Sequence, residues 1–179
     1  MRSVVRSVSA CVVVLAAGMV VAAIPAGASH YRFPASGLVT DVEQTALASA
    51  KVNTTLAFMR AAASVKARTA LAGRTGISVV RLEKLSCQVD LLRVDGVGPS
   101  MVKLLQASGS IHTGVLRTQT GDGLYAQLES VNKSRNMVPV LPSAVTLADW
   151  VKQAKRLKQT LELPKTPSAP APPTPTTDE

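Results

Sequence analysis

The sequence is poor in the side chains that cross-link a small exported domain. It contains two cysteines in 179 residues, and Cys11 lies in a leader that we expect to be removed. Cys87 would then remain alone, so the exported chain cannot form an internal disulfide and must be held together by packing. Because leucines and valines surround Cys87 in the sequence, we expect a buried small hydrophobe rather than a reactive thiol.

Groupings of residues that would support catalysis or metal binding are also missing. His112 is the only histidine inside the expected domain, and no set of three or four metal ligands accompanies it. No serine or cysteine lies in a G-x-S-x-G context. The acids Asp90, Asp95, Asp122 and Glu129 are scattered, which is typical of helix caps and surface charges. We therefore expect no enzyme, no cofactor and no metal site.

No stretch alternates apolar and polar residues for long enough to predict a sheet, so the expected fold is all-α. A turn is expected to begin at Asp90, and the last helix carries an apolar stripe anchored in the core by Trp150 and extending to Leu161. We expect helices to be capped or opened by Asp41, Asn53, Ser64, Ser78, Pro99 and the capping box at Thr146, with another helix after the break at 121–123.

The N-terminus has the features of a signal peptide. A positive region at Arg2 and Arg6 precedes an almost wholly apolar run over 8–24, and the small residues 26–28 follow Pro25. Met19 stands where a lipidated cysteine would be needed, so no lipid anchor is expected. We expect cleavage after Ala28 and a periplasmic or extracellular protein. The alternative is an uncleaved membrane anchor, because the run approaches the roughly 18 residues of a spanning helix.

The rest of the chain divides by composition into three parts. We expect an N-terminal segment with a short helix at 29–52, a compact domain at 53–163 and a tail at 164–179. The tail alternates proline with threonine, serine and alanine. It cannot bury enough apolar surface to offset its ordering entropy, so we expect it to be disordered.

Positive charge exceeds negative charge along the chain. The formal net charge is +9 from 20 basic and 11 acidic residues, and removal of the two leader arginines leaves +7. A basic body is typical of proteins with anionic partners such as nucleic acid, an acidic polymer or a phospholipid surface. The expected last helix carries a cluster of basic residues, Lys152, Lys155, Arg156 and Lys158. These side chains either bind along a polyanion or form a solvated face, where cations are favoured near a helix C-terminus.

The most informative segment is 91–99, Leu-Leu-Arg-Val-Asp-Gly-Val-Gly-Pro. Gly96 and Gly98 permit a sharp turn, Val97 between them can fill the cleft between two helices, and Pro99 suits the first position of a helix. Backbone N–H groups of such a turn and the N-terminus of the next helix point the same way, which favours an anion.

This pattern resembles the helix-hairpin-helix motif, in which turn amides hold a nucleic-acid phosphate without reading the base. The resemblance implies that Gly96 and Gly98 offer the amides, with Val97 as the plug and Lys103 as a nearby positive charge. The sequence departs from the motif at Ser100, where lysine or arginine is frequent, and at 102, where valine replaces a small alanine.

A weaker copy of the pattern lies upstream at a constant offset, with Gly76 and Ile77 in place of Gly96 and Val97. Ser78 replaces the second glycine, so we expect this copy to be structural. The motif order over roughly 53–157 is similar to an uncharacterised bacterial family of unknown function built on paired hairpins; it includes Lys66-Ala67-Arg68, Gly96-Val97-Gly98, Leu124-Tyr125-Ala126-Gln127-Leu128 and Asp149-Trp150-Val151. The resemblance implies a tandem helix-hairpin-helix unit.

These features predict an exported, non-catalytic binding module that contacts nucleic-acid phosphates without sequence preference. Its site residues would be Gly96, Val97, Gly98, Ser100 and Lys103, and its partner DNA or another polyanion. The alternative is an envelope protein-interaction or structural domain in which the hairpin only packs helices. No small-molecule substrate is expected, and the sequence leaves the oligomeric state open.

Overall fold

The computed structural model describes residues 31–163, and within this range the chain is helical and contains no strand. The expected all-α fold is confirmed for these residues, whereas the expected signal peptide and tail lie outside them. No helix between 31 and 163 has both the length and the apolar character needed to cross a membrane. The helices of this part are α1 Phe33–Ser36, α2 Asp41–Ser49, α3 Thr55–Ala62, α4 Val65–Thr75, α5 Val79–Leu91, α6 Pro99–Ala107, α7 Thr113–Leu116, α8 Gly121–Arg135 and α9 Ala144–Arg156.

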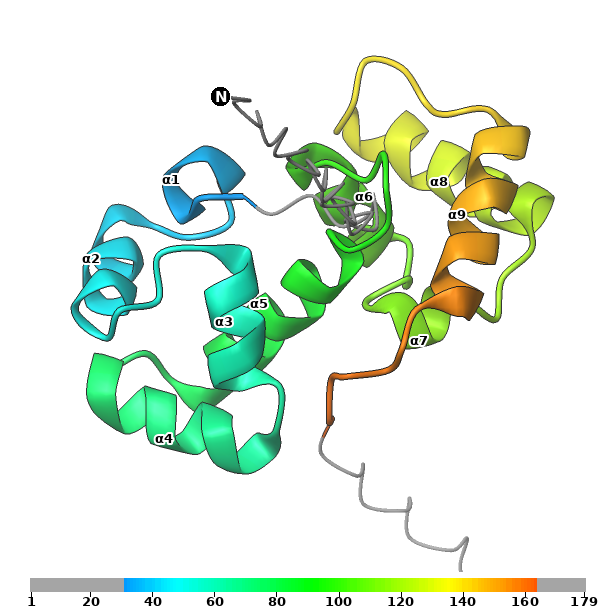
Figure 1. The fold of residues 1–179 in the computed structure, drawn as a ribbon. Helices are drawn as coiled ribbons and strands as arrows, with labels where there is room; N and C mark the ends of the chain where they lie inside the picture. Colours follow the sequence, from blue (N-terminus) through cyan, green and yellow to red (C-terminus); the bar gives the residue numbers. More distant parts are fainter. Residues whose placement is uncertain (1–30, 164–179) are drawn as a thin grey trace, which may run out of the picture.

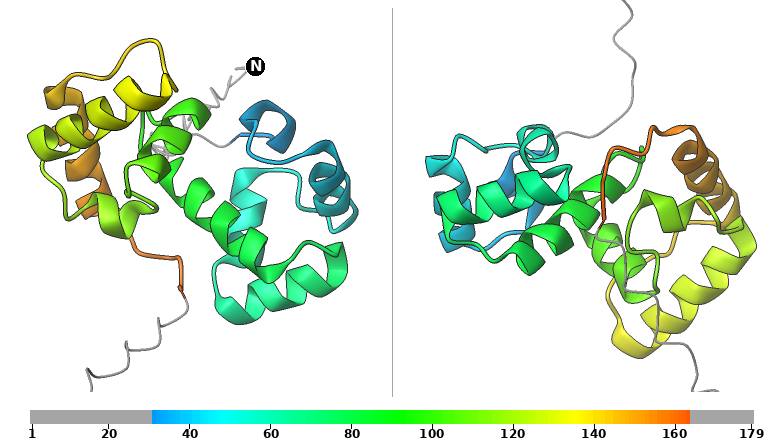
Figure 2. Two further views of the ribbon diagram at one scale, coloured as in Figure 1. Left: turned by 180° about the vertical axis from the view of Figure 1, so that it is seen from behind. Right: turned by 90° about the horizontal axis from the view of Figure 1, so that it is seen from below.

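Helix α5 runs through the middle of the molecule and connects its two sides (Figure 1). Helices α1 to α4 lie on one side, where α3 packs on α4 and α5, and α7 to α9 lie on the other, where α8 packs on α9. The views from behind and from below show the same division (Figure 2). Buried leucines and valines of both sides, together with Phe58 and Trp150, form one hydrophobic cluster.

Several helix starts lie where the sequence predicts them. The side chain of Ser64 accepts a hydrogen bond from Ala67 N–H at the start of α4, and Ser78 accepts one from Arg81 N–H at the start of α5. Pro99 is the first residue of α6. Each hydroxyl pairs with an amide that has no partner inside its helix, which is the physical reason that capping patterns can be read from sequence.

Three other predicted starts are wrong by a few residues. The cap of α2 is Thr40 rather than Asp41, that of α3 is Thr54 rather than Asn53, and that of α9 is Ser143 rather than Thr146. Neighbouring polar residues have side chains that are equally able to cap a helix. Tertiary packing selects among them, because the cap must have an extended backbone and a side-chain oxygen near the free amides. Thr40 is chosen by a capping box: its hydroxyl accepts from Glu43 N–H while the Glu43 carboxylate accepts from Thr40 N–H.

Two predicted interruptions and one predicted helix end are also corrected. The break at 121–123 is the first turn of α8, capped by Thr120. The turn expected at Asp90 starts later, because α5 continues to Leu91. The apolar stripe of the last helix ends early, since α9 stops at Arg156 and Leu161 lies beyond it.

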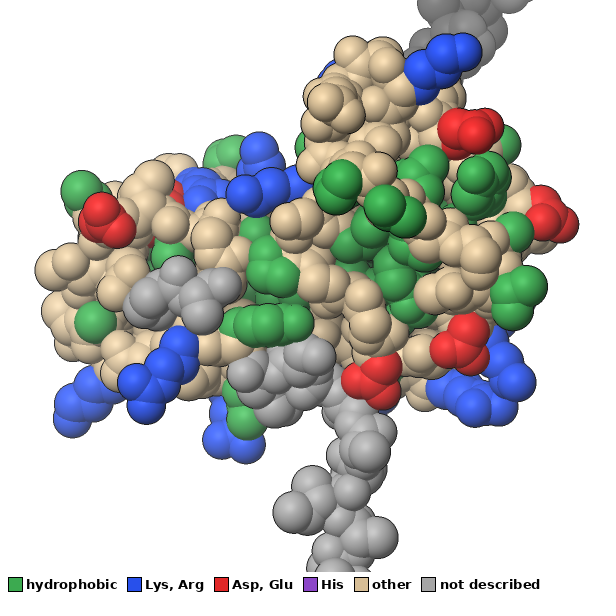
Figure 3. Space-filling view, turned by 90° about the horizontal axis from the view of Figure 1, so that it is seen from above, with side chains coloured by type: hydrophobic (Ala, Val, Ile, Leu, Met, Phe, Trp, Pro, Cys, Tyr) green, Lys and Arg blue, Asp and Glu red, His purple; other side chains and the backbone are tan. Residues whose placement is uncertain are grey.

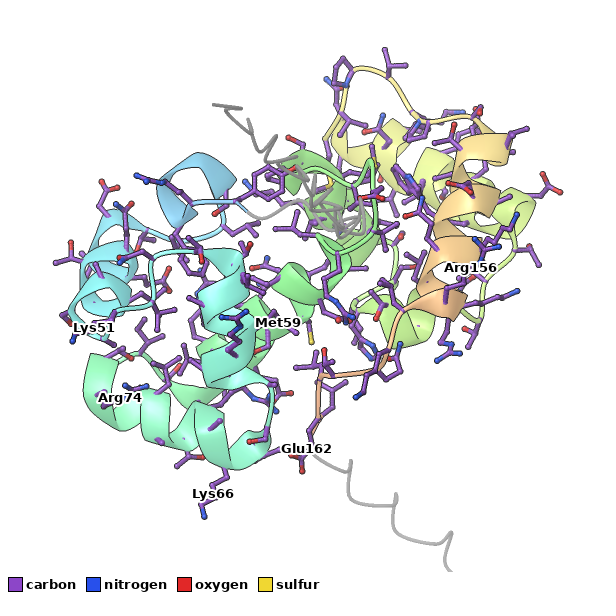
Figure 4. The ribbon with its side chains drawn as sticks, viewed as in Figure 1. Lys51, Met59, Lys66, Arg74, Arg156 and Glu162 are labelled. Atoms are coloured by element: carbon purple, nitrogen blue, oxygen red, sulfur yellow. The ribbon has the colours of Figure 1, made fainter. Side chains whose placement is uncertain are left out.

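The chain beyond α9 runs back across the molecule as an extended segment, which we call the strap (residues 157–163) (Figure 1). It ends beside the corner between α3 and α4, where Glu162 lies (Figure 4). There Glu162 N–H donates to Ala63 O at 2.8 Å, and the fully buried guanidinium of Arg68 donates to the carbonyls of Glu162, Ala62 and Ala63. The strap therefore joins the C-terminal end of the described chain to its N-terminal helices.

Candidate functional site

The segment predicted as a hairpin connects α5 and α6 through a tight turn. Gly96 has φ of +87°, a left-handed conformation that favours glycine, while Gly98 is the extended residue that caps α6. A hydrogen bond of 3.1 Å from Val97 N–H to Val94 O closes the turn. The glycines thus differ in role, since only Gly96 requires glycine for its backbone angle.

The structure places the five predicted site residues in two layers. Val97 is 1% exposed and belongs to the hydrophobic cluster, so it lies beneath the turn as a buried apolar residue. Ser100 and Lys103 are exposed on the first turns of α6, and Gly96 is exposed at the turn itself. A side chain at Gly98 would meet open space, with no atom within 4 Å of its Cβ position.

Backbone amides at the start of α6 are available. The N–H groups of Gly98, Ser100 and Met101 donate to no described residue, and Pro99 has no N–H. No side chain caps the helix. Such amides, aligned with the positive end of a helix dipole, are the groups that hold oxyanions in proteins.

The other side of the turn is covered by α9. The indole nitrogen of Trp150 would lie 3.1 Å from a Cβ on Gly96, and Asp95 N–H donates to the side-chain oxygen of Gln153 at 2.9 Å. The Gln153 side chain also donates to Asp149 at 2.7 Å. The carboxylate of Asp149 therefore lies on the covered side and disfavours an anion there. The sequence pattern around the turn did not indicate this contact, because α9 lies far from the turn in the sequence.

The upstream turn, between α4 and α5, has a similar backbone but different surroundings. Gly76 has φ of +72°, and Ile77 beneath it is buried. The side chain of Ser78 is engaged as the cap of α5. Glu43 of α2 reaches this corner and pairs with Arg81, whose hydrogen bonds lower the pKa of that carboxyl to about 2. A carboxylate of the protein itself thus already lies at the upstream corner.

A buried polar cluster links α5 to α7. Asp90 is 1% exposed and accepts hydrogen bonds from Thr113 N–H, the Thr113 hydroxyl and Arg93. The prediction that Asp90 is a helix cap or a surface charge is therefore wrong, since its buried carboxylate joins α5 to α7. His112 caps α7 by accepting from Gly114 N–H at 3.0 Å, and burial lowers the pKa of His112.

Cys87 is buried, as the sequence predicts. Burial raises the pKa of the Cys87 thiol to about 11, which keeps it protonated near neutral pH and makes it a poor nucleophile. Between residues 31 and 163 no group of three or more His, Cys, Asp or Glu side chains is arranged to hold a metal ion.

The comparisons with known proteins agree with the resemblance seen in the sequence at the level of the family. Residues 38–157 match the family described as "Domain of unknown function (DUF4332)". No curated protein and no solved structure matches the chain. Because the match covers most of the sequence, this chain belongs to the DUF4332 family.

Proposed function

We propose that this protein is an exported, non-catalytic binding module that holds nucleic-acid phosphates through the α5–α6 turn, used as a helix-hairpin-helix motif. The observation that carries the proposal is the set of unpartnered amides at Gly98, Ser100 and Met101, next to a glycine with open space in front of it. Contacts of this kind position a backbone phosphate and carry no sequence information.

The surroundings of the turn set the direction of approach. Trp150 and Gln153 cover the Gly96 side, and the Asp149 carboxylate lies on that side, so a phosphate would approach from the Gly98 side. Lys103 is exposed one turn into α6 and adds a positive charge to that helix. The site is small, so its affinity would be weak and would fall with salt.

Only one of the paired turns is free for such a contact. The two turns share α5, so they lie at its opposite ends, about 20 Å apart for a helix of this length. The upstream turn already has a carboxylate of α2 beside it. The proposal therefore assigns binding to the downstream turn and a packing role to the upstream one.

The second candidate is an interaction or structural domain of the cell envelope in which both turns only join helices. The packing of α9 over the Gly96 side favours it, because a turn that serves as scaffold is expected to be covered by its neighbours.

Binding of duplex DNA to residues 29–179 separates these candidates. We expect a Kd in the range of about 1–100 μM, weakening as salt rises from about 50 to 200 mM. Gly98→Glu should reduce the affinity at least about tenfold, because it puts a negative charge in front of the amides. The matched control is Gly98→Ala, which adds one methyl group to open space at a φ of −91° that alanine adopts freely.

A second test compares the salt dependence of DNA binding between two lysine variants. Lys103→Gln should lower the salt slope by about one counterion, whereas Lys66→Gln on α4 should leave it unchanged. Lys66 points away from the protein at the far end of the molecule (Figure 4). DNA affinity that is equal in wild type and Gly98→Glu would reject phosphate binding at the turn and leave the scaffold role.

Export is part of the proposal and has its own test. N-terminal sequencing of the protein recovered from outside the cytoplasm should begin at Ser29. A chain that keeps Met1 and sediments with membranes would instead support the anchored alternative.

A further inference from the structure

An open groove lies between α5 and α6, on the part of the hairpin away from its turn. Its volume is about 730 Å³, and the end of α8 closes one side with Arg135 and Met137. Val80 on α5 and Ile111 after α6 line it, and both are exposed, by 80% and 43%. These are two of the few large apolar side chains that the described residues leave to solvent. In the view from above, hydrophobic side chains gather in one part of the surface, and both acidic and basic side chains lie around them (Figure 3).

The charged residues of the groove are mostly of one sign. Lys84, Lys103 and Arg135 line it, against a single acid, Glu83. None of the three cations forms a salt bridge with a described residue. The groove thus presents an apolar surface bordered by unpaired positive charge.

A buried polar atom in the wall of the groove lacks a partner. Gln88 is 6% exposed, and its amide nitrogen donates to the Gln106 side chain at 3.0 Å. The oxygen of the Gln88 amide is buried and accepts no hydrogen bond. A buried acceptor without a donor is costly, and because this oxygen is closed to solvent, a ligand donor would reach it only after the Gln88 side chain turns toward the groove.

We propose that this groove binds an acidic, amphipathic helical segment of a partner protein. The apolar face of the segment would cover Val80 and Ile111, and its carboxylates would face the three cations. The groove follows α5 from Val80 to Gln88, about 12 Å, which matches two helical turns.

The lining of the groove favours a protein over a nucleic acid. Its side chains include no aromatic residue, so it offers no surface on which bases stack, and stacking is the main contribution of a groove that holds single strands. Exposed valine and isoleucine instead suit an aliphatic anchor. The groove shares Lys103 with the phosphate proposal but does not include Gly96, Gly98 or Ser100, so a substitution at Gly98 tests the two proposals separately.

The probe for this proposal is a fluorescently labelled helical peptide with Leu, Trp and Leu on one face and Glu on the others. Fluorescence anisotropy with residues 29–179 should show saturable binding. A peptide with the same apolar face and Lys in place of Glu should bind at least about tenfold more weakly, because the groove is positively charged. Gly98→Glu should leave peptide affinity unchanged while it weakens DNA, which separates failure of this proposal from failure of the other.

Matched variants control for the basic charge of the whole protein. Lys84→Glu should weaken the peptide at least tenfold, and Lys66→Glu, with the same charge change on α4, less than about twofold. Val80→Asp should abolish binding, whereas Val42→Asp should not, although both valines are 80% exposed. Equal losses within either pair, equal binding of the Lys peptide, or no saturation up to about 1 mM peptide would overturn the proposal.

Discussion

The ion pair between Glu43 and Arg81 shows how a single contact joins distant parts of this protein. Glu43 belongs to α2, caps that helix through Thr40 N–H, and accepts from Arg81 Nη2 at 2.8 Å. Arg81 belongs to α5 and also donates to Leu38 O at 2.7 Å. The capping of α2 and its pairing with α5 therefore depend on the same carboxylate, and neither helix alone would fix the position of that carboxylate.

This pair should make stability depend on pH. Hydrogen bonding to Arg81 lowers the pKa of Glu43 from 4.5 to about 2. A carboxyl with a lowered pKa in the folded state stabilises the protein above its unfolded pKa, and the contribution is lost as the pH falls from about 4.5 towards 2. Glu43→Gln should cost about 1–2 kcal/mol at pH 6 and progressively less below pH 4. Urea unfolding of both proteins from pH 6 to 3 measures the difference; a constant gap would contradict the role of charge.

Gly96 should be far less tolerant of substitution than Gly98. Its φ of +87° strains any L side chain, and a Cβ would lie 3.1 Å from the Trp150 indole nitrogen. We expect Gly96→Ala to lower the free energy of unfolding by about 1–3 kcal/mol. Gly98→Ala, the control, should change it by less than about 0.5 kcal/mol. Thermal unfolding measures the stability of both variants. Equal effects of the two substitutions would show that Gly96 does not have a left-handed backbone conformation.

At the scale of elements, the contact between α8 and α9 depends on close approach at one glycine. A Cβ on Gly121 would lie 2.7 Å from the backbone oxygen of Ala144 and 2.7 Å from the side chain of Ala148. The segment that the sequence predicts as a break is thus a packed helix start. Glycine is needed there for space, because the neighbour is backbone and cannot rotate away.

The same substitution should have opposite effects in two helices. Gly121→Ala should destabilise the protein by about 1–3 kcal/mol, because α9 would have to move. Gly73→Ala, inside α4 and with nothing within 4 Å of its Cβ position, should stabilise it by about 0.5–1 kcal/mol through helix propensity. Denaturant midpoints measure both, and a stabilising Gly121→Ala would contradict the packing of α8 on α9.

At the scale of the whole molecule, the strap connects parts that are far apart in sequence. Besides its contacts at Arg68, Arg93 at the end of α5 donates to Lys158 O at 2.9 Å and to the Thr160 hydroxyl at 3.2 Å. Arg68 has no carboxylate partner among the described residues; its two terminal nitrogens donate to carbonyls, one of which the strap supplies, and its buried Nε has no partner among them. The folded unit therefore extends past residue 157, where the family match ends.

Truncation should test this boundary. Removal of 164–179 should leave the melting temperature nearly unchanged, whereas removal of 158–179 should lower the free energy of unfolding by about 2–4 kcal/mol, because several hydrogen bonds are lost and Arg68 loses a buried partner. Calorimetry of the two truncated chains measures the difference. Equal stability of both would show that the strap contributes nothing to the fold.

The sequence by itself determined what depends on short range. Periodic apolar positions gave the all-α class, Ser64, Ser78 and Pro99 gave helix starts, and the Gly-Val-Gly pattern gave the tight turn. Each follows from the conformational preferences of a few adjacent residues, and these preferences do not change with the rest of the fold.

Only the tertiary structure decided the surroundings of those elements. It selected Thr40 over Asp41 as a cap, buried Asp90 against α7, and placed Trp150 over one side of the turn while the other side stayed open. The groove and the strap also come from chain segments far apart in sequence. Burial and pairing depend on which helices meet, and a one-dimensional pattern does not contain that information.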